Sequence, residues 1–225
     1  MRINEDIITN DVSAERQTSE KCKVTIEDEN AVRVLFLGNS ITLHETAPQI
    51  GWNVNWGMAA SAEDKDYVHL TLDYLRGLYG KVNYCVTNVG EWEKHFNDDG
   101  VLKKFSAAAD FGADIVIFRL GENVDKTLLE SADFKGSFEK FCDCFTTKAK
   151  ETIVTDTFWE HEGICSILES VAKSRGYTFV KICDLGYDDA NKATGLFWHN
   201  GVAAHPGDLG MKRIAERISG AIRKV

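Results

Sequence analysis

The sequence lacks the features by which nucleic-acid-binding and membrane-spanning chains are usually recognised. Its 225 residues include 26 lysines and arginines against 35 aspartates and glutamates, for a net charge of −9, and the basic residues form no cluster. A chain with this charge repels a polyanion, so nucleic acid is not an expected partner. The apolar runs are only as long as a strand, which is too short for a membrane-spanning helix, and no membrane partner is expected.

Proline is also scarce, and the sequence has neither paired cysteines nor an apolar N-terminal segment. There are two prolines, and the segment from Met1 to Asn30 is polar and acidic without a signal-peptide core, which predicts a cytoplasmic protein. The six cysteines, at positions 22, 85, 142, 144, 165 and 183, show no C-x-x-C spacing. Several lie in apolar patterns, so buried, reduced thiols are favoured over disulfides or zinc ligands. We expect no metal and no cofactor.

The chain does have β-rich apolar runs that alternate with helical patterns. Strands are predicted over 32–37, 82–87, 114–119, 152–155 and 178–182, and helices over 62–79, 102–111, 132–148, 161–175 and 208–224. Nearly continuous apolar runs are typical of parallel strands covered on both faces by amphipathic helices. We therefore predict an α/β fold, a three-layer α/β/α flavodoxin-like sandwich whose mostly parallel sheet has about five strands. Residues 31–225 form this domain, and residues 1–30 form an N-terminal extension or an edge strand.

Short polar segments follow the predicted strands. Ser40 comes after the first strand, behind Gly38 and Asn39, two residue types that tolerate tight backbone geometry. A serine in such a turn also caps helices, so Ser40 alone does not define a site. The motif is not G-x-S-x-G, because Thr42 stands at its last position, and no phosphate-binding glycine motif is present.

Three further segments reach the same predicted sheet edge. Gly90 follows the second strand, Asn123 follows the third, and His205 precedes the last helix. Each has an ordinary structural explanation: a turn glycine, an Asx turn, and a structural histidine beside the helix-capping Asp208. Because the carboxyl ends of parallel strands meet at one edge, their joint placement favours a shared site.

These segments resemble the sequence blocks of the SGNH-type (GDSL-like) hydrolases of the esterase and lipase superfamily. The first block usually reads GDS, and Asn39 here replaces its Asp; Val124 departs from the last position of the third block, G-x-N-D. The resemblance spans residues 31–224. It implies a nucleophile, two oxyanion donors and a base, which are Ser40, the Gly90 N–H, the Asn123 side chain and His205, respectively.

The fourth block, D-x-x-H-P in the family, lacks its acid. Val202 stands three residues before His205, where the family has Asp. If two residues are inserted, Asn200 aligns with that Asp and can orient the imidazole through its side-chain carbonyl. A backbone carbonyl, His199 or a carboxylate such as Glu160 or Glu162 is the alternative.

The resemblance implies ester hydrolysis through a covalent acyl-serine. Aromatic side chains suit sugar rings or flat acyl groups, and Trp52, Trp56 and Trp159 are the expected substrate contacts, although core packing explains any one of them equally well. By the habits of the family, the expected substrate is a small-molecule or carbohydrate ester, and an acetyl ester above all. The oligomeric state stays open.

Two other functions are compatible with the sequence. A metal-dependent hydrolase can be built from His199, His205 and Asp208, whose imidazole and carboxylate groups suit zinc. The missing Asp and the replaced first-block Asp also fit a catalytically inactive relative that binds glycan or protein.

Overall fold

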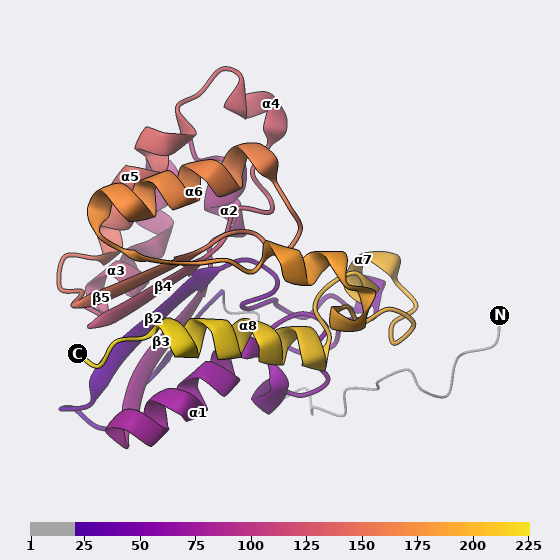
Figure 1. The fold of residues 1–225 in the computed structure, drawn as a ribbon, viewed down its shortest axis with the longest axis horizontal. Coiled ribbons are helices and arrows are strands. Elements are labelled where there is room, and N and C mark those ends of the chain that lie inside the picture. Colours follow the sequence, from indigo (N-terminus) through magenta and orange to yellow (C-terminus); the bar gives the residue numbers. More distant parts are fainter. Residues whose placement is uncertain (1–20) are drawn as a thin grey trace.

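The computed structural model describes residues 21–225 and places a six-stranded sheet between two layers of helices (Figure 1). The strands are β1 (Cys22–Thr25), β2 (Val32–Gly38), β3 (Val82–Asn88), β4 (Ile115–Arg119), β5 (Glu151–Thr155) and β6 (Thr178–Val180). The α-helices are α1 (Tyr67–Tyr79), α2 (Gly90–Lys94), α3 (Ser106–Asp110), α4 (Lys126–Leu129), α5 (Phe134–Phe145), α6 (Glu162–Arg175), α7 (Asn200–Ala203) and α8 (Asp208–Ala221). Short 3-10 helices cover Pro48–Ile50, Glu63–Lys65, Asp99–Phe105, Cys183–Tyr187 and Asp189–Asn191.

The strand order is β1-β3-β2-β4-β5-β6, and the five strands from β2 to β6 are parallel. This confirms the predicted three-layer α/β/α sandwich. β1 adds an antiparallel edge beside β3, with Cys22 opposite Thr87. The rest of the expected N-terminal extension, residues 1–20, lies outside the described residues.

Alternate residues of each central strand enter two separate cores. On β2, Val34 and Phe36 pack with α1 and α8, whereas Leu35 and Leu37 pack with α2, α5 and α6. Figure 1 shows the same division, with α1 and α8 on one face of the sheet and α5 and α6 on the other. Because both faces are covered, the strand is apolar almost without interruption, as parallel strands require.

The predicted helices are correct in place but often shorter than expected. The pattern over 62–79 divides into a 3-10 turn and α1, because the Asp66 carboxylate accepts the His69 N–H at 2.8 Å and caps α1. The pattern over 102–111 divides into a 3-10 helix and α3. The sequence analysis missed α2, α4 and α7, because four or five residues are too few to show a helical period.

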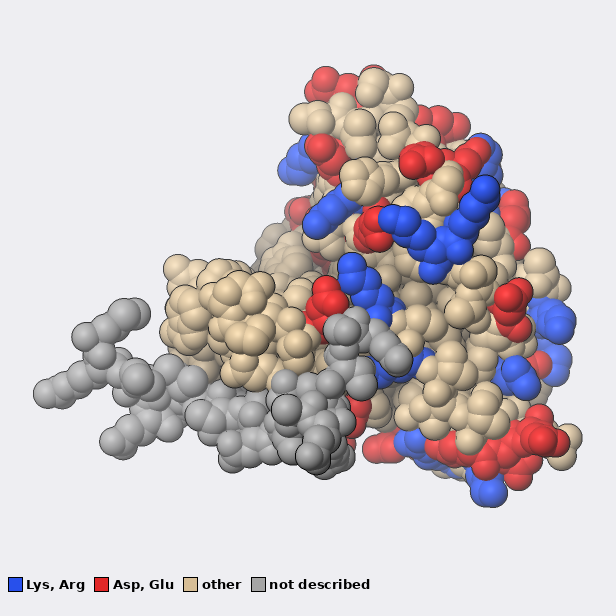
Figure 2. All heavy atoms as spheres, turned by 180° about the vertical axis from the view of Figure 1, so that it is seen from behind, with Lys and Arg blue, Asp and Glu red and all other residues tan. Residues whose placement is uncertain are grey.

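Within residues 21–225, no helix combines the length and the apolar character that a membrane crossing needs. On the face shown in Figure 2, lysine and arginine side chains lie among aspartates and glutamates. Surface ion pairs in the described residues include Lys104–Glu91, Lys140–Asp99 and Arg175–Asp143. Pairs of this kind contribute little to stability, so the two cores supply most of it.

The aromatic cluster between α2 and α5 provides a test of the fold. Phe141 stacks on Trp92 with ring centroids 4.0 Å apart and is fully buried. We expect Phe141→Ala to lower the free energy of unfolding by about 3–5 kcal/mol, because a buried aromatic side chain leaves a cavity. Urea denaturation measures this, with Tyr74→Ala on the exposed face of α1 as the control. A Phe141→Ala loss no larger than that of the control contradicts the assignment of this core.

Candidate active site

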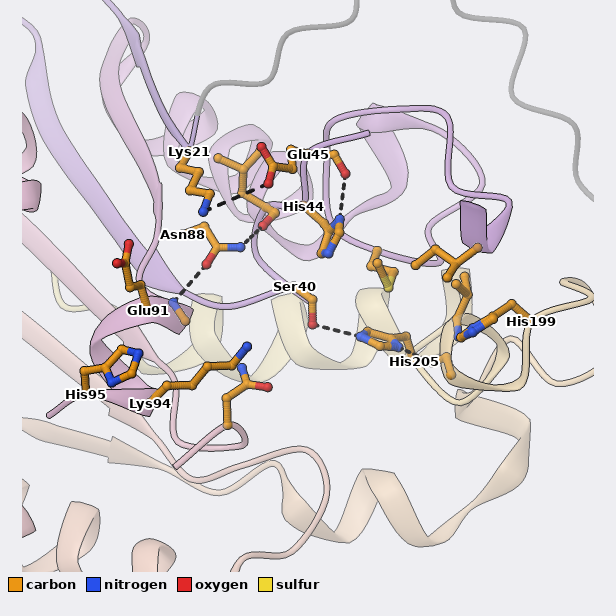
Figure 3. A pocket seen from close by; sticks show the side chains of 17 residues that line it. Lys21, Ser40, His44, Glu45, Asn88, Glu91, Lys94, His95, His199 and His205 are labelled. Atoms are coloured by element: carbon orange, nitrogen blue, oxygen red, sulfur yellow. Dashed lines mark hydrogen bonds and ion pairs between the residues drawn. The ribbon is translucent and has the colours of Figure 1, made fainter. Parts of the chain in front are cut away.

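The carboxyl ends of β2, β3 and β4 meet at one edge of the sheet. Gly38 at the end of β2 pairs with Asn88 on one side and Arg119 on the other. A side chain at Gly38 would collide with the Arg119 carbonyl at 2.5 Å, so only glycine lets the two strand ends come this close. Above this edge lies a cavity of about 600 Å³, lined in part by Ser40, His44, Asn88, Gly90, Asn123 and His205 (Figure 3).

Ser40 and His205 point toward each other in this cavity (Figure 3). The Ser40 Oγ lies 2.8 Å from the His205 Nε2. Ser40 sits in a tight turn that is closed by the Asn39 carbonyl, which accepts the Thr42 N–H at 2.9 Å. The side chain is half-buried, so its hydroxyl faces the cavity instead of the core. This is the arrangement of a nucleophile beside its general base.

The second nitrogen of His205 contacts a backbone carbonyl and not a carboxylate. His205 Nδ1 lies 2.6 Å from the Gly201 oxygen. A carbonyl only accepts hydrogen bonds, so Nδ1 carries the proton and Nε2 presents its lone pair to the Ser40 hydroxyl. The carbonyl therefore fixes the tautomer that a general base needs.

This contact corrects the expectation that Asn200 is the third member of the site. Asn200 is the first residue of α7 and is exposed, whereas the following residue supplies the carbonyl. His199 is no substitute, because its Nδ1 faces the Val202 N–H at 3.4 Å. Glu160 bonds the Tyr187 hydroxyl, and Glu162 is exposed at the start of α6. The partner of His205 Nδ1 is the backbone carbonyl, one of the alternatives from the sequence.

His205 is held in its neutral form. Burial lowers its pKa to about 4, and the hydrogen bond to the Gly201 carbonyl only partly offsets this shift. Trp159 packs against the imidazole edge to face, with ring centroids 4.9 Å apart. At neutral pH the imidazole is unprotonated and ready to accept a proton.

The two expected oxyanion donors lie side by side, but both are already engaged. A side chain built at Gly90 would lie 3.6 Å from the Asn123 Nδ2. The Gly90 N–H donates to the Asn88 Oδ1 at 2.9 Å, which departs from the expectation that it faces the reacting carbonyl. The Asn123 Nδ2 donates to the Glu93 Oε2 at 2.6 Å and has a second hydrogen to offer. The Ser40 N–H donates to no group within residues 21–225.

Under the Ser40 turn lies a cluster that we call the buried charge network: Asn39, Glu93, Arg119 and Glu122. Arg119 is 0% exposed, and its Nη1 donates to the Glu122 Oε1 at 2.6 Å. The Asn39 Nδ2 donates to both carboxylates, at 3.0 Å to Glu93 and 2.6 Å to Glu122, and its Oδ1 accepts from Arg119. Burial and the neighbouring Glu122 raise the pKa of Glu93.

The sequence analysis missed Glu93, Arg119 and Glu122. The sequence does indicate a buried charge at Arg119, because this residue is the only charged one in the apolar run of β4. A charged side chain at the end of a buried strand needs a buried partner. Glu93 gave no such signal, since α2 is too short to reveal its buried face.

The expected substrate contacts need correction. Trp52 and Trp56 are 0% and 6% exposed and pack edge to face in the core with centroids 6.1 Å apart. Their loop folds back on the Ser40 turn, as shown by the Met58 N–H, which donates to the Ser40 carbonyl at 2.8 Å. Neither indole is therefore available as a platform. Trp159 is half-buried against His205, and the exposed indole nearby is Trp198, at 55%.

The metal-site alternative is not supported by the positions of its ligands. His205 is engaged by Ser40 and Gly201, while the Asp208 Oδ2 accepts from the Ser61 hydroxyl at 2.7 Å. In the part of the chain that the structure describes, no three His, Cys, Asp or Glu side chains come together in a way that could hold a metal ion.

No family model and no curated protein matches this chain. Solved structures do. A mutant of an acetylxylan esterase from Geobacillus stearothermophilus, Axe2, aligns with a TM-score of 0.52 at 14% identity over 89% of this chain and 98% of that one. A two-domain esterase active on acetylated mannans aligns with a TM-score of 0.54 at 15% identity over 84% of this chain and 49% of that one.

A third similar structure carries the name of the family. It is a putative lipolytic protein of the G-D-S-L family from Desulfitobacterium hafniense, with a TM-score of 0.51 at 13% identity over 85% of this chain and 99% of that one. The resemblance noted in the sequence blocks is thereby confirmed at the level of the fold: the chain has the fold of the SGNH-type (GDSL-like) hydrolases.

The buried charge network predicts that restoring the usual family residue at position 39 harms this chain. Asn39→Asp replaces a donor to two carboxylates by a third carboxylate, so we expect the free energy of unfolding to fall by about 3–5 kcal/mol at pH 8. The new buried carboxyl has a raised pKa, so the loss is smaller at pH 5, where the group binds a proton in the folded state. Denaturation of the variant at the two pH values measures this.

Asn200→Asp serves as the matched control, because the same substitution is made at an exposed position. We expect it to change the free energy of unfolding by less than about 0.5 kcal/mol at either pH. If Asn39→Asp is as stable as this control at pH 8, the network does not depend on the Asn39 amide.

Proposed function

We propose that this protein is a serine esterase that hydrolyses small acyl esters through a covalent acyl-serine, with an acetyl group on a carbohydrate as the favoured substrate. The observation that carries the proposal is the continuous contact from Ser40 through His205 to the Gly201 carbonyl. It gives the serine a neutral base in the correct tautomer, inside a cavity large enough for a small ester.

In the acylation step, the Ser40 Oγ attacks the ester carbonyl while His205 Nε2 takes the hydroxyl proton. Negative charge develops on the carbonyl oxygen, and we assign its stabilisation to the Ser40 N–H and the second Nδ2 hydrogen of Asn123. The Gly90 N–H joins them only if the Asn88 carboxamide releases it. His205 then gives its proton to the leaving alcohol, and water hydrolyses the acyl-serine by the same steps in reverse order.

The substrate class rests on similarity. Two of the similar structures are described as acting on acetylated xylan or mannan. The cavity also suits a small acyl group on a polar alcohol, because it combines hydrogen-bonding side chains such as His44, Asn88 and Lys94 with the apolar Leu43 and Ile50.

The direct test of the nucleophile is Ser40→Ala. We expect the variant to lose hydrolysis of p-nitrophenyl acetate and of acetylated xylooligosaccharides, by at least about a thousandfold in kcat, while it folds normally because no core contact is removed. Fluorophosphonate labelling of the wild type, and its absence in the variant, identifies the same hydroxyl. A Ser40→Ala enzyme that keeps most of its rate, or a wild type that neither labels nor hydrolyses esters, rejects the proposal.

The pH profile tests the base and its partner. His205 acts only when neutral, and because burial lowers its pKa to about 4, we expect the acidic limb of kcat/KM near pH 4 instead of near the usual histidine pKa. Activity therefore stays close to its maximum at pH 6.

Substitutions at Asn200 provide the control for this profile. If the Gly201 carbonyl orients the imidazole, Asn200→Ala and Asn200→Asp leave both kcat/KM and the position of the acidic limb unchanged. An Asn200→Asp profile displaced to higher pH would instead show that a carboxylate at position 200 reaches Nδ1 and favours the imidazolium.

A further inference from the structure

Glu93 is a buried carboxylate that contacts three separate parts of the candidate site. It lies in α2, the short helix that begins at Gly90, and is 0% exposed. Its carboxylate accepts three hydrogen bonds, from the Asn123 Nδ2 at 2.6 Å, from the Asn39 Nδ2 at 3.0 Å and from the Gly121 N–H. One carboxylate thus joins the segments that follow β2, β3 and β4.

The contact to Asn123 matters because of where that residue lies. Asn123 is an exposed loop residue at the rim of the cavity, and Glu93 is its hydrogen-bond partner among residues 21–225. An exposed carboxamide without a partner rotates freely, since its terminal torsion is broad. When one Nδ2 hydrogen is anchored to a buried carboxylate, the plane of the amide is fixed, and the direction of the second hydrogen is fixed with it.

The surroundings of Glu93 require an acceptor with two free oxygens. All three of its neighbours approach with an N–H group, two toward Oε1 and one toward Oε2. Arg119 supplies the nearby positive charge, and it reaches Glu93 indirectly, through Asn39, whose Oδ1 it contacts. A glutamine of the same shape offers one oxygen and one NH2 group, so at least one donor is left facing another donor.

We propose that Glu93 is a positioning residue for the ester hydrolysis proposed above: its carboxylate aims the Asn123 amide at the oxyanion. The inference rests on the proposed function, because it gives Asn123 its role in that reaction. Glu93 touches neither the substrate nor Ser40 and acts through Asn123. Orientation of this kind is effective because a donor displaced by about 1 Å can lower a rate by about 100-fold.

The alternative is that Glu93 serves stability alone, by satisfying buried donors. The two roles differ in a double-mutant cycle with Asn123. If Glu93 acts through Asn123, its substitution matters only while the amide is present, so the effects of Glu93→Gln and Asn123→Ala on kcat do not multiply. If its role is stability alone, the substitution alters the unfolding midpoint but leaves kcat of the folded enzyme unchanged.

The experiment measures kcat and KM for p-nitrophenyl acetate hydrolysis by the wild type, Glu93→Gln, Asn123→Ala and the double variant, with unfolding followed in parallel. We expect Asn123→Ala to lower kcat by about 100- to 1000-fold and Glu93→Gln by about 10- to 100-fold, with KM changed by less than about threefold. The double variant should match Asn123→Ala within about threefold.

Glu151→Gln is the matched control. Glu151 is also a buried carboxylate that accepts hydrogen bonds, from the Thr178 hydroxyl at 2.7 Å and from Arg223. It is the first residue of β5 and so lies at the amino-terminal ends of the parallel strands, away from the site at their carboxyl ends. We expect this variant to lose stability and keep the wild-type kcat. If Glu93→Gln does not fold, Glu93→Asp replaces it in the cycle. The shorter side chain keeps the negative charge but moves the carboxylate away from the Asn123 Nδ2.

The outcomes separate the inference from the proposed function. A wild-type enzyme without Ser40-dependent hydrolysis overturns both. When that hydrolysis is present, an unchanged kcat in the folded Glu93 variant, or a double variant whose loss equals the product of the two single losses, overturns the role of Glu93 alone. A loss in kcat that disappears in the Asn123→Ala background supports it.

Discussion

The structure of the candidate site depends on keeping charged groups buried where three strands end. Arg119, Glu93 and Glu122 are all inside the protein, where an isolated charge is costly and a partly paired cluster is worse than an apolar core. Asn39 makes the cluster possible, since its amide bonds both carboxylates and its carbonyl bonds the arginine. The same residue forms the turn that presents Ser40, so the buried charges and the half-buried Ser40 hydroxyl share one short segment.

Most of the fold could be predicted from the sequence because parallel strands that are covered on both faces appear as nearly continuous apolar runs. Both cores draw on alternate residues of the central strands β2 to β5, and these strands are therefore mostly apolar on both faces. The sequence places Ser40 and Asn123 after strand ends and His205 before the last helix, and the structure brings these residues into one cavity. Their roles in catalysis stay predictions until the variants are measured.

The errors have physical causes that no local pattern reveals. Trp52 and Trp56 are candidates for substrate contact or for core packing by sequence, and the structure supports core packing, because their loop forms its own hydrogen bonds and buries both indoles. Asn200 aligns with the family Asp, but the acceptor is a main-chain atom one residue later, and no residue type marks which backbone carbonyl meets an imidazole. Glu93 was missed because a five-residue helix has no readable period, and its importance arises from contacts across 28 and 54 positions of sequence.

The contact between His205 and the Gly201 carbonyl involves an atom that no substitution at position 201 removes. Substitution can remove a catalytic carboxylate, but every amino acid that replaces Gly201 carries the same carbonyl, so the acceptor itself cannot be mutated away. A Cβ added at position 201 would lie 2.9 Å from a ring carbon of His199. Such a substitution would therefore displace His199 and leave the carbonyl acceptor in place. A motif that requires an acid before the histidine overlooks this contact, because every residue carries a carbonyl and the sequence does not mark the one that meets His205.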